Sequence, residues 1–162
     1  MTVPADIIDW TILNEIVSMD EDDPGFSKGL IIQYIDQATT TFKEMDDLLD
    51  NVDNLKELDN LGHFLKGSSA ALGLQRIAWA CERIQNLGRK AEDEFPKRTE
   101  ILKNLPDKVS VESQDKSEPL DDQPIPADDT KYLLLIKRAL AQARIEFKLA
   151  RKELSDYYKS EL

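Results

Sequence analysis

The chain has 162 residues, 41% hydrophobic and 33% charged, which is enough for one domain with a buried core and too few for two. It carries 21 Lys and Arg against 32 Asp and Glu, a formal net charge of −11 that repels phosphate backbones and anionic lipids. One Cys and one His exclude a disulfide framework and any metal site that needs clustered His and Cys ligands. A basic docking patch on another protein is the kind of partner that this charge favours.

No basic segment precedes an apolar run at the N-terminus, and no apolar stretch approaches the roughly 20 residues that a bilayer span requires. We therefore expect a soluble protein in a reducing compartment.

Apolar residues three and four apart predict helices along most of the chain. Asp6 is expected to cap a first short helix that ends near Ser18, before an acidic turn at 20–25. Ser27 is expected to cap a longer second helix that reaches about Leu49. The predicted inner face of this second helix consists of Ile31, Ile35, Ala38, Phe42, Met45 and Leu49.

The pattern predicts a third helix from about Asn54 to a left-handed stop at Gly73, and a fourth from about Leu74 to Ala91. Their inward positions are expected at Leu58, Leu61, Leu65, Ser69, Leu72, Ile77, Cys81, Ile84, Gly88 and Ala91.

Residues 93–129 hold most of the prolines and are expected to form a mobile connection, opened by a short helix from about Lys97 to Leu105. The helical pattern resumes at Thr130 and continues to the C-terminus. We therefore predict one all-α domain over residues 1–162. It is an antiparallel four-helix bundle with an additional short N-terminal helix and a long flexible connection before the last helix.

The most informative segment surrounds His63, the one histidine of the chain. At about 100° per residue this side chain lies about 140° from Leu58, so it should point away from the bundle interior. A neutral imidazole keeps a free lone pair at pH 7 and is a usable nucleophile toward a phosphoryl donor.

Lys66, three residues later, can bring a cation to an anionic group on the ring, and Gly67 leaves the ring bare on its C-terminal side. On the fourth helix Gln85 and Arg89 are four residues apart and could supply an amide and a second cation. Purely structural alternatives stay open at this point. Gly67 could be a close helix contact, and Lys66 a solvated surface residue. Gln85 and Arg89, taken alone, are better interpreted as solvated polar residues.

These residues resemble the motif of the histidine-containing phosphotransfer (HPt) family: His63-x-x-Lys66-Gly67-Ser68-Ser69, followed by Gly73-Leu74. The resemblance extends to the stand-alone, budding-yeast type of HPt protein that acts in an osmosensing phosphorelay. It covers most of the chain outside 93–129 through the blocks WTILNEIVSMD, FSKGLIIQYIDQA, ELDNLGHFLKGSSAALGLQRIAW, CERIQNLGRK and EFKLARKELSDYY.

The resemblance implies a phosphocarrier that accepts a phosphoryl group on His63 from the aspartate of one response-regulator receiver domain and passes it to the aspartate of another. Lys66 and Arg89 would stabilise charge, Gly67 would clear the approach, and Gln85 would hydrogen-bond near the imidazole. No cofactor is expected on this chain, because Mg²⁺ is held by the receiver. The resemblance further implies a cytoplasmic location, and a mass of 18.5 kDa is compatible with passage into the nucleus. A monomer is expected, because no long unexplained apolar stripe demands a dimer.

The first predicted helix is apolar on two sides, whereas a helix packed only on its own bundle needs one. We expect one stripe to be buried and the other to form a partner patch with an acidic rim. A more deeply buried helix is the alternative. The predicted partner-binding residues are Ile12, Glu15, Ile16, Met19, Asp20, Asp23, Phe26 and Leu30.

Two other classes of function remain to be weighed against a phosphocarrier. A non-catalytic, acidic helical adaptor would bind a basic partner without any chemistry at His63. An autonomous kinase or phosphatase fits least, because the sequence shows no Gly-rich phosphate loop and no recognisable pair of catalytic carboxylates.

Overall fold

A computed structural model describes residues 2–116 and 123–162, and within these ranges every regular element is a helix. This confirms the all-α prediction. In chain order the elements are α1 (Trp10–Val17), the 3-10 helix η1 (Ser18–Glu21), α2 (Phe26–Leu48), η2 (Val52–Asn54), α3 (Leu55–Ala71), α4 (Gln75–Gly88), α5 (Arg98–Leu102), η3 (Ser113–Asp115) and α6 (Thr130–Tyr158).

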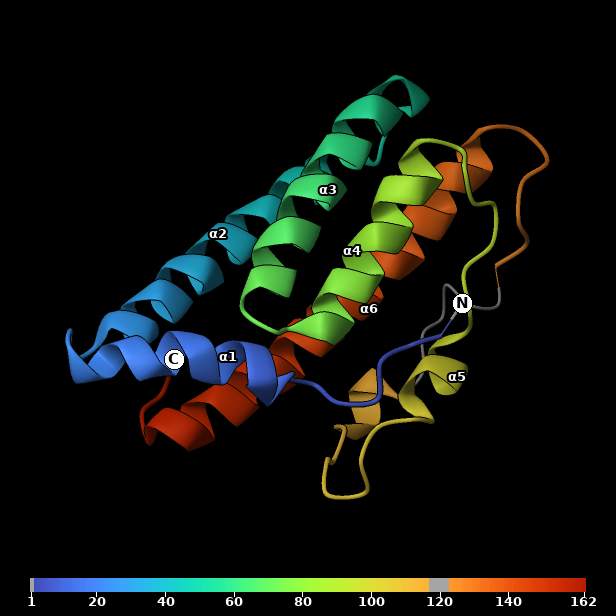
Figure 1. Cartoon of the computed structure of the whole chain (residues 1–162). Helices are drawn as coiled ribbons and strands as arrows, with labels where there is room; N and C mark the ends of the chain where they lie inside the picture. The colour runs from blue at the N-terminus through green and yellow to red at the C-terminus, as the bar shows by residue number, and fades with distance from the viewer. Residues whose placement is uncertain (1, 117–122) are drawn as a thin grey trace.

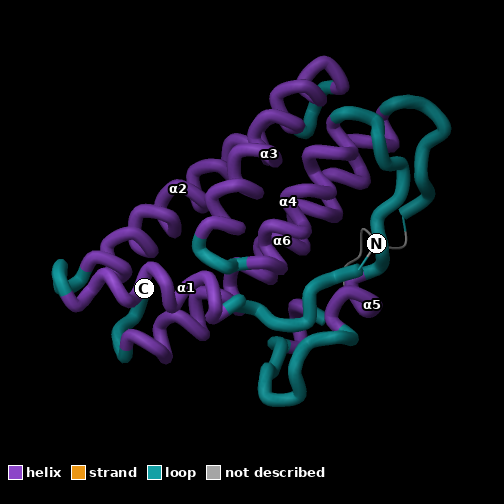
Figure 2. The backbone as a smooth tube through the Cα atoms, viewed as in Figure 1, coloured by secondary structure: helices purple, strands orange, loops and turns teal. Residues whose placement is uncertain are grey.

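Helices α2, α3, α4 and α6 form the bundle, and α1 crosses one end of it (Figure 1). Helix α4 packs against both α3 and α6, while α2 completes the ring by contacting the same two helices. The tube in Figure 2 shows that the described parts of the connection between α4 and α6 run along one side of the bundle and include α5. The core contains the predicted inner faces, for example Ile31, Phe42, Leu65, Ile84 and Leu140.

Two helix starts differ from the sequence prediction. Asp9 rather than Asp6 caps α1, because its Oδ1 accepts a hydrogen bond from the Thr11 amide at 3.0 Å. Ser27 lies inside the first turn of α2 and is buried rather than serving as the cap. Its amide and hydroxyl donate to the Asp20 carboxylate at 2.8 and 2.6 Å, so Asp20 caps α2 from the preceding turn.

The connection before the last helix is more closely packed than the sequence predicts. Arg98 and Ile101 of α5 are buried, and the Arg98 Nε donates to the Gln142 Oε1 on α6 at 3.3 Å. Residues 117–122 of this connection lie outside the described residues. The predicted inward position of Ala91 is wrong: α4 ends at Gly88, and Ala91 is exposed beyond Lys90, whose positive φ turns the chain away.

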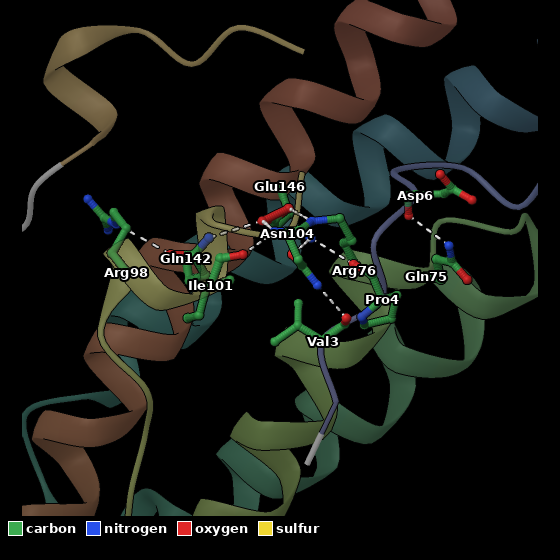
Figure 3. Close-up of polar contacts among 10 residues, drawn as sticks. All are labelled: Val3, Pro4, Asp6, Gln75, Arg76, Arg98, Ile101, Asn104, Gln142 and Glu146. Atoms are coloured by element: carbon green, nitrogen blue, oxygen red, sulfur yellow. Dashed lines mark hydrogen bonds and ion pairs between the residues drawn. The ribbon is translucent and has the colours of Figure 1, made fainter. Parts of the chain in front are cut away.

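A buried arginine fastens this connection and the N-terminal segment to the bundle (Figure 3). The guanidinium of Arg76 donates to both carboxylate oxygens of Glu146, at 2.6 and 2.8 Å. It also donates to the Pro4 carbonyl and the Asn104 amide oxygen at 2.7 Å each, and to the Ile101 carbonyl at 3.0 Å. These bonds use the full donor capacity of the guanidinium, so α4 holds the segment that leads into α1.

Within the part of the chain that the structure describes, none of the helices has the length and apolar character that crossing a membrane would demand.

Candidate functional site

His63 stands in the middle of α3 and is exposed, as its position on the helical wheel predicts. Across residues 2–116 and 123–162, no hydrogen bond or ion pair joins its imidazole to another side chain. The exposed ring is therefore not held by another side chain, and either nitrogen of a neutral imidazole can carry the lone pair that a nucleophile needs.

Glycines on α3 and α4 bring these two helices close together behind His63. A Cβ at Gly62 would lie 2.8 Å from the Gln85 amide nitrogen, and one at Gly88 would lie 2.8 Å from the Leu55 carbonyl oxygen. Gly67 behaves differently, because a Cβ there would meet nothing within 4 Å. The alternative that Gly67 serves as a close helix contact is therefore wrong, and its small size leaves open surface next to His63.

Two ion pairs link α3 to α4, one on each side of His63. Toward the C-terminus of α3, the Lys66 Nζ lies 3.4 Å from the Glu82 Oε1. Toward its N-terminus, the Arg89 Nε lies 2.9 Å from the Asp59 Oδ1. At a rise of about 1.5 Å per residue, His63 lies about 4.5 Å along the axis from one α3 partner and about 6 Å from the other.

The Arg89–Asp59 pair is rigidly held. Asp59 is 2% exposed and Arg89 50% exposed, and the Lys56 Nζ approaches the second carboxylate oxygen of Asp59 at 3.4 Å. In the amide orientation that satisfies its neighbours, the Gln85 oxygen accepts from both terminal nitrogens of Arg89, at 3.0 and 2.9 Å. Gln85 is buried beside Gly62 and positions Arg89, and in this structure its amide does not bind the imidazole.

Of the two serines after Gly67, Ser69 ties α3 to α2 and Ser68 bonds within α3 itself. Ser69 is buried and shares a 2.6 Å hydrogen bond with the Tyr34 hydroxyl of α2, while the Ser68 hydroxyl donates to the Phe64 carbonyl. Burial raises the pKa of Tyr34, so its phenol stays protonated and able to donate. The Tyr34–Ser69 hydrogen bond therefore helps to fix the wall of the bundle on which His63 stands.

The predicted partner patch is exposed in part. Ile12 and Met19 are exposed, Ile16, Phe26 and Leu30 are half-buried, and Leu13 lies in the core, so α1 does present two different apolar faces. Ile8 precedes α1 and is buried in the core. Phe64, next to His63, is a large exposed apolar side chain that the sequence reading did not include.

The acids of the predicted rim differ from one another. Glu15 and Asp23 are exposed, as a steering rim requires. Asp20 is partly buried and accepts both hydrogen bonds from Ser27, so it is not a free rim charge. In the described ranges, no group of three or more His, Cys, Asp and Glu side chains is arranged to hold a metal ion.

The sequence reading missed three residues of the site: Asp59, Gly62 and Glu82. Asp59 stands one turn before His63, a spacing that could have flagged it. The other two depend on which turns of α3 and α4 face each other. That register is set by the close approach at Gly62 and Gly88, and helical periodicity does not reveal it.

An exposed histidine on the wall of a helical bundle, flanked by a lysine and an arginine from two helices, defines the class of histidine phosphotransfer domains. The chain belongs to this family: the Hpt domain model matches residues 29–145.

Close relatives support the assignment along the whole chain. The phosphorelay intermediate protein YPD1 of Saccharomyces cerevisiae is 61% identical over 165 residues, covering 99% of each chain. The crystal structure of the yeast protein matches with a TM-score of 0.86 at 60% identity, covering 100% of both chains. A co-crystal structure of yeast Ypd1 with the receiver domain of its downstream response regulator Ssk1 matches with a TM-score of 0.85 at 60% identity, covering 99% of this chain and 100% of that one.

Proposed function

We propose that this chain is a phosphorelay intermediate, which takes a phosphoryl group onto His63 from one receiver domain and delivers it to another. The observation that carries the proposal is the exposed, unbonded imidazole between two cation-bearing turns of α3 and α4. The yeast relative named a phosphorelay intermediate supports it.

Each of the two transfers, onto His63 and away from it, forms one bond to phosphorus and breaks another. The imidazole lone pair forms the N–P bond while the O–P bond to the receiver's aspartate breaks, and the electron pair leaves with that carboxylate. The proton on the other ring nitrogen stays in place, and the second transfer is the reverse. Lys66 and Arg89 supply positive charge for the phosphoryl oxygens, and Mg²⁺ belongs to the receiver rather than to this chain.

Replacing His63 with Gln should abolish phosphoryl acceptance, because Gln retains a polar side chain without the ring lone pair. Wild-type protein incubated with a radiolabelled phospho-receiver should acquire an acid-labile, base-stable label. The variant should acquire none while its circular dichroism stays unchanged. Equal labelling of both proteins, or a label that is stable to acid, would contradict the proposal. A non-catalytic adaptor would bind the receiver and take no label.

The partners we propose are receiver domains of a hybrid sensor kinase and of downstream regulators. The yeast relative crystallised with one such domain supports this class. We place the docking surface on α1 and the start of α2, where Ile12, Ile16 and Met19 adjoin Phe26 and Leu30. An apolar centre tolerates variation between several partners better than a set of obligatory ion pairs.

Replacing Ile12 with Asp should weaken receiver binding about tenfold, because a charge would be buried at the centre of the interface. Ile32 is the matched control. It is 43% exposed against 37% for Ile12, and it lies two residues from Leu30, on the other side of α2. Ile32→Asp should leave the affinity unchanged by isothermal titration calorimetry. Equal loss in both variants, or none in Ile12→Asp, would rule out this surface.

For its location we propose the cytoplasm with access to the nucleus, in keeping with a mass of 18.5 kDa. We further propose that the chain acts as a monomer, because its large apolar side chains are mostly used in its own core.

A further inference from the structure

The two ion pairs that flank His63 along α3 differ in how firmly they are held. In the Arg89–Asp59 pair the carboxylate is buried and the guanidinium is also bound by Gln85, so this cation is fixed. In the Lys66–Glu82 pair both side chains are partly exposed, 37% and 40%, and the N–O distance is 3.4 Å. Lys66 is therefore the cation that can move, on a flexible four-carbon stem.

Glu82 is held more firmly than Lys66. Its Oε2 lies 3.1 Å from the NH2 of Arg83, which is 3% exposed and belongs to the same helix. When Lys66 leaves, Glu82 keeps this partner and stays on α4. The Glu82 carboxylate therefore competes for the Lys66 ammonium group with any anion that forms on His63. His63 lies three residues before Lys66 on α3.

We propose that Glu82 is a positioning residue that restrains Lys66 and thereby limits the stability of the phosphoryl group on His63. The inference rests on the proposed function, since it concerns the phosphorylated state of that residue. A phosphoryl group carries up to about two negative charges at pH 7, which attract Lys66 away from Glu82. The lost ion pair offsets part of that attraction, so the phosphoryl group remains easy to pass on.

The equilibrium constant for phosphoryl exchange with a receiver tests this directly. Because it compares free species, it is independent of how tightly the two proteins dock. Glu82→Gln should shift the equilibrium toward phosphohistidine about two- to fivefold, the range expected for one partly exposed ion pair. Glu44→Gln, which changes an exposed carboxylate on α2, is the matched control and should leave the constant unchanged.

Two further measurements separate positioning from a general change of charge. In a Lys66→Gln background, Glu82→Gln should have no effect, because there is no longer a lysine to restrain. In the background that retains Lys66, the difference in equilibrium constant between Glu82→Gln and wild type should also shrink at about 1 M salt. At that concentration exposed charges are screened within about 3 Å.

Two results would overturn the inference: the same equilibrium constant for Glu82→Gln and wild type, or a shift that persists when Lys66 is absent. A wild-type protein that takes no label on His63 would instead refute the proposed function, so the two failures can be told apart.

Discussion

Replacing Arg76 with Met should lower the free energy of unfolding by about 3–5 kcal/mol, because the variant leaves the buried Glu146 carboxylate without its cation. Only the 3.0 Å hydrogen bond from the Gln142 amide would remain on that carboxylate from the contacts shown in Figure 3. The Pro4 and Ile101 carbonyls would lose their donor as well. Urea unfolding followed by circular dichroism measures the change.

An exposed arginine provides the control for this change. Arg144 pairs with Asp46 on the surface, and their side chains are 43% and 44% exposed. Arg144→Met should cost no more than about 1 kcal/mol. The double variant Arg76→Met with Glu146→Met should recover much of the loss, because the unpaired charge is gone. If Arg76→Met and Arg144→Met had equal effects, the Arg76 contacts would not be the fastening that we describe.

The same substitution at two glycines of α3 should have opposite effects on stability. Gly62→Ala places a Cβ against backbone atoms of α4, 2.8 Å from the Gln85 nitrogen and 3.0 Å from the Cys81 oxygen. Because backbone cannot move aside cheaply, we expect a loss of about 1–3 kcal/mol. Gly67→Ala meets nothing within 4 Å, so helix propensity should dominate and raise stability by about 0.5–1 kcal/mol.

The melting temperatures of the two variants and of wild type, measured by thermal unfolding, test these opposite effects. Gly62→Ala should also reduce the rate of phosphoryl acceptance, since separating α3 from α4 moves Gln85 and Arg89 away from the wall that carries His63. A Gly62→Ala melting temperature equal to or above that of wild type would show that the close approach of α3 and α4 does not depend on Gly62. A Gly67→Ala melting temperature below that of wild type would contradict the open space at Gly67.

The helices could be predicted because their apolar spacing is regular. The stripe from Ile31 to Met45 and the Gly73 stop, whose φ is +80°, required only local information. The starts were harder, since Asp6 and Asp9 are equally good caps in sequence and the choice is made by tertiary contacts. Asp9 donates its amide to the Gly73 carbonyl at 2.8 Å, which places α1.

The sequence predicts the exposed histidine of the site but not the ion pairs around it. The exposure of His63 followed from its angle to the core stripe, and the open space beside Gly67 agrees with the role implied by family resemblance. The pairing of Lys66 with Glu82 and of Arg89 with Asp59 could not be found in this way, because each ion pair bridges two helices whose register the sequence does not show. In sequence, the buried Arg76 also looks the same as a solvated arginine on an amphipathic helix.

Passage of one phosphoryl group through His63 is the central claim, and a rapid-quench chase measures it. Radiolabelled phospho-receiver is mixed with the wild-type chain, and an unlabelled second receiver is then added. We predict that the label moves onto the chain as phosphohistidine and then appears on the second receiver as a base-labile acyl phosphate, with matching rates of loss and gain. Label that reaches the second receiver equally well through the His63→Gln chain, or that leaves the wild-type chain only as inorganic phosphate, would contradict it.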